Sequence, residues 1–197
     1  MDLILYWRGP VGPGQFPTDP VQIEKINQAG VYLRIKLYED ERSIAYIGQS
    51  LHLVTRFDQH ISGLLALQHP LRDESGEVTG GPGAESRFQI LNDVAHAGSL
   101  AIAEAQRTRF YFAMAQDGFD QDYLTLIEAM LKSRAEKVMY DRPENIQNIN
   151  PGEFDHDISI VSDFAEIDDQ GVNLIERTIG MEPILIPARQ ESFENAD

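Results

Sequence analysis

The chain has 197 residues, of which 42% are hydrophobic, which is enough for one domain with an ordinary core plus extensions. It has no cysteine, which excludes disulfides and thiolate metal sites and fits a reducing cytoplasm. The formal net charge is −16, which is opposite in sign to the usual charge of a polyanion-binding protein.

Neither a membrane helix nor a signal peptide is expected. No apolar run approaches the ~18 residues that a membrane-spanning helix needs. The N-terminal sequence MDLILYWRGP has a short apolar patch, but it lacks a basic leader and a long apolar region. We therefore expect a cytoplasmic protein without a membrane partner.

Residues 1–29 are predicted to form an N-terminal extension. Residues 3–7 fit a strand added to the edge of a sheet. A short helix is predicted across residues 21–28, because Asp19 suits its N-cap and Pro20 suits its first position.

A strand, a turn, a second strand and a helix are predicted next. Residues 31–38 alternate between apolar and polar side chains, which predicts a half-buried strand. A charged turn at 39–42 and a second strand at 44–47 complete an antiparallel hairpin. Gly48 ends the hairpin, and Ser50 is expected to cap the following helix.

That helix has an apolar stripe and a polar face. The stripe consists of apolar residues at helical spacing, namely Val54, Phe57, Ile61, Leu64 and Leu65. Arg56 and His60 are four residues apart, so they lie on one face of the helix, one turn from each other.

An insertion is predicted at about residues 69–106, with a Gly-rich loop across 74–86. Residues 108–115 alternate again and predict a third strand. A helix is predicted at 121–137, and its buried stripe consists of Leu124, Ile127 and Leu131. Glu128 lies beside that stripe, where a carboxylate requires a specific partner.

Residues 151–197 are predicted to form an acidic C-terminal extension, since they contain 12 acidic and 2 basic residues. A strand at 158–161, a helix at 172–179 and an extended segment at 183–187 are expected within it. The acidity either serves solubility alone, or forms a surface that covers a basic face or binds a protein partner.

The hairpin and the helix after it resemble the GIY-YIG nuclease family. Gly30-Val31-Tyr32 matches the first motif, with Val in place of the usual Ile, and Tyr46-Ile47-Gly48 matches the second motif unaltered. Arg56 follows Tyr46 by ten residues and His60 follows Arg56 by four, as in the family's R-x-x-x-H pattern. A motif of this kind is a hypothesis that its structural context tests.

The resemblance covers about residues 30–150 and implies an α+β fold. The expected domain is small, with a three-stranded antiparallel sheet flanked by helices. The predicted insertion at 69–106 precedes its third strand, and extensions at 1–29 and 151–197 flank it.

The resemblance also implies roles for individual residues. Tyr32 would be the general base, and Arg56 would bind the non-bridging oxygens of the phosphate. Tyr46 would position the water or the phosphate, and His60 would contact the phosphate or transfer a proton. Glu128 would hold a divalent ion, Mg²⁺ or Mn²⁺, with water and phosphate in the rest of its shell.

The excision-repair branch of the family carries a late active-site asparagine in a Pro-x-Tyr-Asn element. Here the Tyr is missing, and Asn145 follows Pro143 by two residues. Asn145 is the expected equivalent of the family's asparagine, and Asn148 and Asn150 are the alternative candidates.

Two functions follow from the resemblance. The first is a metal-dependent DNA endonuclease of the restriction, repair or mobile-element type. The alternative is a catalytically idle module on the same fold that binds a protein partner through its acidic surface. If the protein is a nuclease, its basic residues are expected to cluster on one face of the molecule. Basic residues scattered over the surface would favour the protein-binding module. The residues in question are Arg42, Arg56, Arg72, Arg87, Arg107, Arg109, Lys132, Arg134, Lys137 and Arg142.

Overall fold

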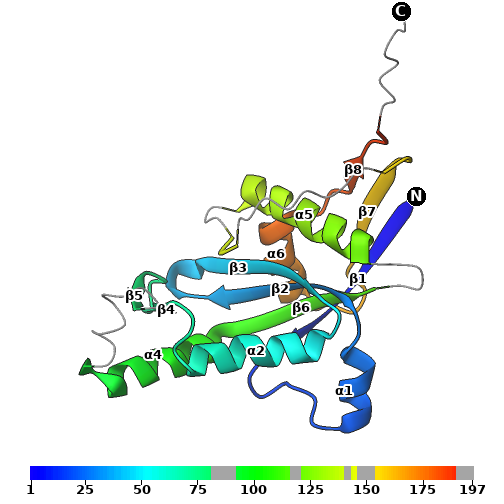
Figure 1. Ribbon diagram of the computed structural model, residues 1–197. Helices are drawn as coiled ribbons and strands as arrows, with labels where there is room; N and C mark the ends of the chain where they lie inside the picture. The colour runs from blue at the N-terminus through cyan, green and yellow to red at the C-terminus, as the bar shows by residue number, and fades with distance from the viewer. Residues whose placement is uncertain (81–91, 116–120, 140–142, 146–153, 190–197) are drawn as a thin grey trace, which may run out of the picture.

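The computed structural model of the chain describes residues 1–80, 92–115, 121–139, 143–145 and 154–189 (Figure 1). The helices are α1 (Pro20–Ile26), α2 (Leu53–Leu65), α4 (Val94–Arg107), α5 (Gln121–Val138), α6 (Asp169–Ile179) and the 3₁₀ turn η1 (Glu39–Glu41). The strands are β1 (Asp2–Val11), β2 (Gly30–Leu37), β3 (Ser43–Ser50), β4 (Leu71–Arg72), β5 (Val78–Gly80), β6 (Thr108–Met114), β7 (Ile158–Asp163) and β8 (Ile184–Ile186).

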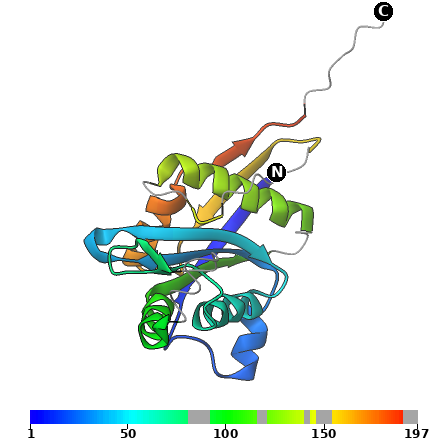
Figure 2. The ribbon, with the colours of Figure 1, turned by 60° about the vertical axis from the view of Figure 1, so that its left-hand side comes forward.

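A six-stranded mixed sheet forms the centre of the molecule, in the order β3-β2-β6-β1-β7-β8. β1 and β7 are parallel, and every other neighbouring pair in this sheet is antiparallel. β4 and β5 form a separate two-stranded sheet. In Figure 2, β1, β7 and β8 rise steeply across the direction of β2 and β3, which shows that the large sheet is twisted.

The expected three-stranded antiparallel sheet is wrong. The three predicted strands are neighbours as β3, β2 and β6, but the sheet continues through β1, β7 and β8. The reason is apolar burial, since Leu3, Leu5 and Trp7 of β1 are 0–1% exposed. An edge position would leave such side chains partly wet, and β1 instead lies between β6 and β7.

Helices cover both faces of the sheet (Figure 1). α5 and α6 lie on one face, over the cluster that includes Leu33, Ile127 and Ile175. α2 and α4 lie beyond the other face (Figure 1). There a smaller cluster is formed by Val11, Tyr32, Leu53, Phe57, Phe110 and Phe112.

β2 is buried on both faces, so the expectation of a half-buried strand is wrong. Arg34 is 3% exposed and Lys36 is 1% exposed, although alternation had assigned them to the polar face. The Lys36 ammonium lies 2.7 Å from Glu104 Oε2 on α4, and Tyr38 Oη donates to the same carboxylate at 3.0 Å. Burial lowers the pKa of Lys36, and the carboxylates of Glu144 and Glu104 oppose this effect.

The local start signals are confirmed at α1 and corrected at α2. Asp19 caps α1 by accepting a hydrogen bond from the Val21 amide, with Pro20 at the first helical position. α2 begins at Leu53 with His52 as its N-cap residue, whereas Ser50 remains in β3. Among the described residues, no helix is long and apolar enough to cross a bilayer.

Candidate active site

Four of the predicted side chains contact one another between β2, β3 and α2. We call Tyr32, Tyr46, Arg56 and His60 the tyrosine cluster. Tyr32 Oη lies 2.8 Å from His60 Nε2 and accepts a hydrogen bond from Arg56 Nε at 3.2 Å. The Tyr46 ring stacks beside the Tyr32 ring at 14° between planes and 6.1 Å between centroids. The motif residues therefore form one contiguous cluster, in which hydrogen bonds join Tyr32 to His60 and Arg56 and ring stacking adds Tyr46.

The hydrogen bond between His60 and Tyr32 has a defined direction. Arg34 NH1 lies 2.9 Å from His60 Nδ1, and a guanidinium group donates only, so Nδ1 accepts. A neutral imidazole carries a single N–H group, which must then be at Nε2. His60 Nε2 consequently donates to Tyr32 Oη. The phenol oxygen thus accepts two hydrogen bonds, one from His60 and one from Arg56.

His60 is neutral near pH 7. Burial, followed by the positive charges of Arg34 and Arg56, lowers the pKa of His60 to about 2. Protonation at Nδ1 would also place an N–H group against the Arg34 guanidinium. The imidazole is therefore a fixed donor to Tyr32 in the physiological range.

Tyr32 is fully buried, with 0% of its surface exposed. Burial raises its pKa, and the hydrogen bond and charge of Arg56 act in the opposite direction. In this state Tyr32 is a protonated phenol. Its two donors are placed where they would stabilise a phenolate once additional positive charge arrives.

Gly48 of the second motif allows the Tyr32 ring to lie against β3. Tyr32 and Gly48 are register partners on the paired strands. A Cβ atom at position 48 would lie 2.5 Å from Tyr32 Oη and 2.6 Å from its Cζ atom. No side chain fits there while the phenol keeps its place, which explains the glycine.

Asn145 closes the free edge of β3 beside the second motif. Its Oδ1 atom accepts from the Ile47 amide at 3.1 Å, and its Nδ2 group donates to the Ile47 carbonyl. The Glu144 amide donates to the Ala45 carbonyl at 2.8 Å. Asn145 therefore positions the strand that carries Tyr46. Its rivals, Asn148 and Asn150, lie outside the described residues.

Glu128 forms a different contact from the one its predicted role requires. It is 8% exposed on α5, and its carboxylate pairs with Lys132 Nζ at 2.9 Å. α5 covers the opposite face of the sheet from α2 (Figure 1). Within the described residues, Glu128 shares no hydrogen bond or ion pair with the tyrosine cluster.

A divalent ion does not fit Glu128 in this arrangement. Mg²⁺ needs few protein carboxylates, so the described chain's lack of a group of three ligating side chains is not decisive. The decisive contact is the Lys132 ammonium, which already neutralises this carboxylate and would repel a second cation beside it.

The motif patterns did not single out Arg34 and Glu144. Arg34 pairs with Glu144 and also donates to His60, so it joins the tyrosine cluster to the edge of β3. One signal was present in the sequence. Arg34 lies two residues after Tyr32, and residues i and i+2 of a strand share a face.

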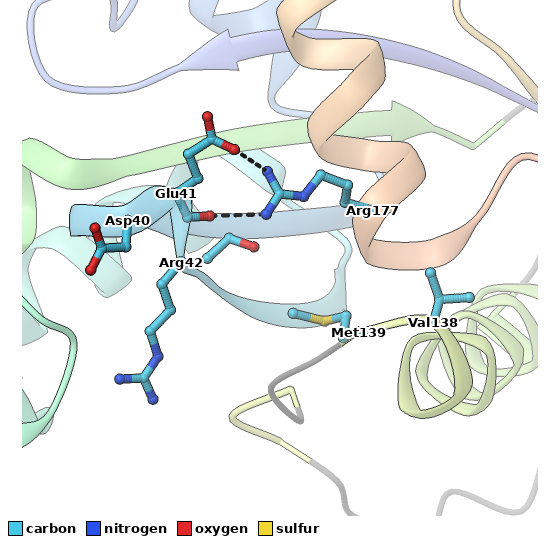
Figure 3. Close-up of a pocket in the computed structure, with 7 residues that line it drawn as sticks. Asp40, Glu41, Arg42, Val138, Met139 and Arg177 are labelled. Carbon is cyan, nitrogen blue, oxygen red and sulfur yellow. Dashed lines mark hydrogen bonds and ion pairs between the residues drawn. The ribbon is translucent and has the colours of Figure 1, made fainter.

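A pocket of about 580 Å³ lies at the turn between β2 and β3, against α6 and the end of α5 (Figure 3). Arg177 pairs with the Glu41 carboxylate at 3.6 Å and donates to its carbonyl at 3.0 Å. Asp40 and Glu41 have φ values of 57° and 58°, which are strained for non-glycine residues. Tyr32 and Gly48 lie at the opposite, open end of the hairpin. Because both of its arginines, Arg42 and Arg177, are already paired with carboxylates, this pocket is a weaker candidate than the tyrosine cluster.

Comparison of the chain with protein-family models, with curated proteins and with solved structures finds no match. The GIY-YIG resemblance therefore depends on the motif residues and their spacing.

Replacing Gly48 by Ala is expected to destabilise the protein by about 1–3 kcal/mol, because the new methyl group overlaps the buried Tyr32 ring. Urea unfolding followed by circular dichroism measures the change. The matched control is Gly98→Ala in α4, where a Cβ atom meets nothing within 4 Å. That substitution should be neutral or stabilising by roughly 0.5–1 kcal/mol. Equal effects at the two positions would contradict the packing described for Tyr32.

His60 should make the folded state less stable at acidic pH. Its pKa is about 2 when folded and about 6.5 when unfolded, so the unfolded chain binds the extra proton between these values. The free energy of unfolding should therefore fall as pH drops from 7 to 4, with up to about 1.4 kcal/mol per pH unit due to His60.

His60→Gln should flatten this slope, since an amide keeps a donor and an acceptor but does not titrate. Denaturation series at several pH values provide the measurement, with the exposed His96→Gln variant as control. A slope that His60→Gln leaves unchanged would show that the imidazole titrates normally.

Proposed function

We propose that this chain hydrolyses phosphodiester bonds in DNA at the tyrosine cluster. The observation that carries the proposal is the phenol oxygen of Tyr32, which accepts hydrogen bonds from both Arg56 and His60. Phosphodiester hydrolysis needs a base for the attacking water and positive charge near the developing negative charge. The cluster contains both kinds of group within hydrogen-bonding distance of each other.

In the proposed reaction each side chain has a separate task. Arg56 keeps its Nε group on Tyr32, and its remaining N–H groups turn to the non-bridging oxygens of the phosphate. Tyr32 must first lose its own proton to solvent when the substrate opens the cluster, and Arg56 and His60 then hold the charge on its oxygen. As phenolate it takes a proton from the attacking water, whose oxygen bonds to phosphorus while the bond from phosphorus to the leaving sugar oxygen breaks and solvent protonates that oxygen. Because Tyr32 is fully buried, the substrate must first displace the Tyr46 ring that lies beside it to admit that water.

The idle module that binds a protein partner is the second candidate. The basic residues favour it, because they are distributed over both faces of the sheet. Arg56 lies on α2, whereas Lys132, Arg134 and Lys137 lie on α5. Carboxylates pair with Arg42, Arg72, Arg107 and Lys132. Arg87 and Arg142 lie outside the described residues.

Cleavage of supercoiled plasmid, linear duplex, single-stranded and branched DNA tests the first proposal. Tyr32→Phe should reduce the cleavage rate by about 10²–10⁴, because the general base is lost while the packing remains. The control is Arg177→Ala, which changes an exposed ion pair at the other end of the hairpin. Cleavage by Tyr32→Phe at the wild-type rate, or none by wild type on any DNA, would contradict the proposal.

The same assay with Mg²⁺, with Mn²⁺ and with EDTA examines the metal that the family resemblance implies. Comparison of Glu128→Ala with Lys132→Ala separates two roles of the carboxylate. Similar effects of the two substitutions indicate a structural ion pair, whereas a loss confined to Glu128→Ala indicates a ligand. If the wild type binds no DNA even at low salt, the protein-binding module becomes the better proposal.

A further inference from the structure

A second pocket of about 230 Å³ adjoins the tyrosine cluster. It is lined by Arg34, Tyr46, His69, Pro70, Arg72 and Glu144, and we call it the arginine pocket. Two of these residues also contact the tyrosine cluster, since Tyr46 belongs to it and Arg34 donates to His60 at 2.9 Å. The pocket and the cluster are therefore joined by shared side chains.

A single carboxylate lies among the cations of this pocket. Glu144 pairs with Arg34 NH2 through Oε2, and its Oε1 atom lies 3.4 Å from Arg72 NH2. Lys36 Nζ approaches the same oxygen at 3.9 Å. Burial alone would raise the pKa of Glu144, but Arg34, Lys36 and Arg72 outweigh it and lower the pKa. Glu144 is therefore an ionised anion held by three cations.

Positive charge is in surplus around the pocket. Its lining holds the guanidinium groups of Arg34 and Arg72 and a single carboxylate, Glu144, so one positive charge is left uncompensated within the lining. Lys36 also approaches Glu144, but it has its own partner in Glu104. Burial and the charge of Arg34 lower the pKa of His69, so this imidazole is neutral near pH 7. In a chain of net charge −16, this local surplus is unusual.

Both arginines of the pocket retain an unused donor. The Nε groups of Arg34 and Arg72 are buried, and neither has a hydrogen-bond partner among the described residues. Arg34 is 3% exposed, so water from bulk solvent does not satisfy it. A buried unpaired donor is destabilising, and an anion with several acceptor oxygens that reached these groups would satisfy them.

We propose that the arginine pocket binds a phosphate group of the substrate, next to the phosphate that is cleaved. This inference rests on the proposed function for the identity of the substrate. A phosphate matches the fork of an arginine and supplies more acceptor oxygens than a carboxylate. Glu144 then occupies the two arginines while the pocket is empty, and a bound phosphate competes with its carboxylate for Arg34 and Arg72.

Pyrophosphate is the probe for binding, measured by isothermal titration calorimetry on the full chain. Arg72→Gln should weaken binding about tenfold, the loss of one charge-assisted contact. Glu144→Gln should strengthen binding by a similar factor, because the competing charge disappears. Arg177→Gln, which removes an exposed cation elsewhere, should change nothing. Equal affinities for Arg72→Gln and Arg177→Gln would overturn the proposal, as would tighter binding of an acidic peptide than of pyrophosphate.

Oligonucleotides with a 5′-phosphate or a 5′-hydroxyl distinguish the sources of the phosphate. An affinity loss in Arg72→Gln for the phosphorylated strand alone supports a site for a terminal phosphate. An equal loss for both strands supports a site for an internal phosphodiester.

The two proposals fail separately. If Arg72→Gln weakens pyrophosphate binding but the wild type cleaves no DNA, the proposed hydrolase activity is rejected and the anion site in the arginine pocket is supported. If Tyr32→Phe abolishes DNA cleavage but Arg72→Gln leaves pyrophosphate affinity unchanged, the phosphate site in the arginine pocket is rejected and the proposed hydrolase activity is supported.

Discussion

Burial of the polar face of β2 determines which segments pack around this strand and which side chains meet there. Tyr32, Arg34 and Lys36 point from alternate positions toward a region that α2 and α4 cover, and each is at most 3% exposed. Buried polar groups require partners, because an unpaired charge in a dry interior is strongly destabilising. Distant segments supply them: His60 and Arg56 from α2, Glu104 from α4, and Glu144 beside β3. The same constraint therefore holds the layers together and assembles the candidate site.

The net charge of the whole molecule is negative, whereas the local charge around the arginine pocket is positive. The net charge of −16 disfavours the approach of a polyanion, and salt screens that repulsion beyond roughly 10 Å. Around Arg34 and Arg72 the balance is reversed, since cations outnumber the carboxylates that they share. An acidic protein with a local cationic pocket is suited to bind a small number of phosphates specifically. It is poorly suited to bind nucleic acid through its whole surface.

Local patterns predicted most of the elements, and long-range contacts account for what they missed. Alternation located β2, β3 and β6, and helical spacing located α2 and α5. Alternation does not reveal which strands become neighbours, so the places of β1, β7 and β8 in the sheet were missed. It also does not distinguish a solvated polar face from one that a helix covers, as at Arg34. The motifs brought Tyr32, Tyr46, Arg56 and His60 together correctly, whereas the ion pair of Arg34 with Glu144 spans 110 residues and has no local signal.

The candidate site depends on the two hydrogen bonds that the Tyr32 oxygen accepts, and the ring nitrogens of His60 report the direction of one of them. A two-dimensional ¹⁵N–¹H spectrum of labelled protein, recorded from pH 7 to pH 5, identifies the protonated nitrogen. The structure predicts a neutral imidazole with its hydrogen on Nε2 throughout this range. A spectrum with the hydrogen on Nδ1, or a His60 that becomes cationic above pH 5, would show that Tyr32 does not accept a hydrogen bond from a neutral His60.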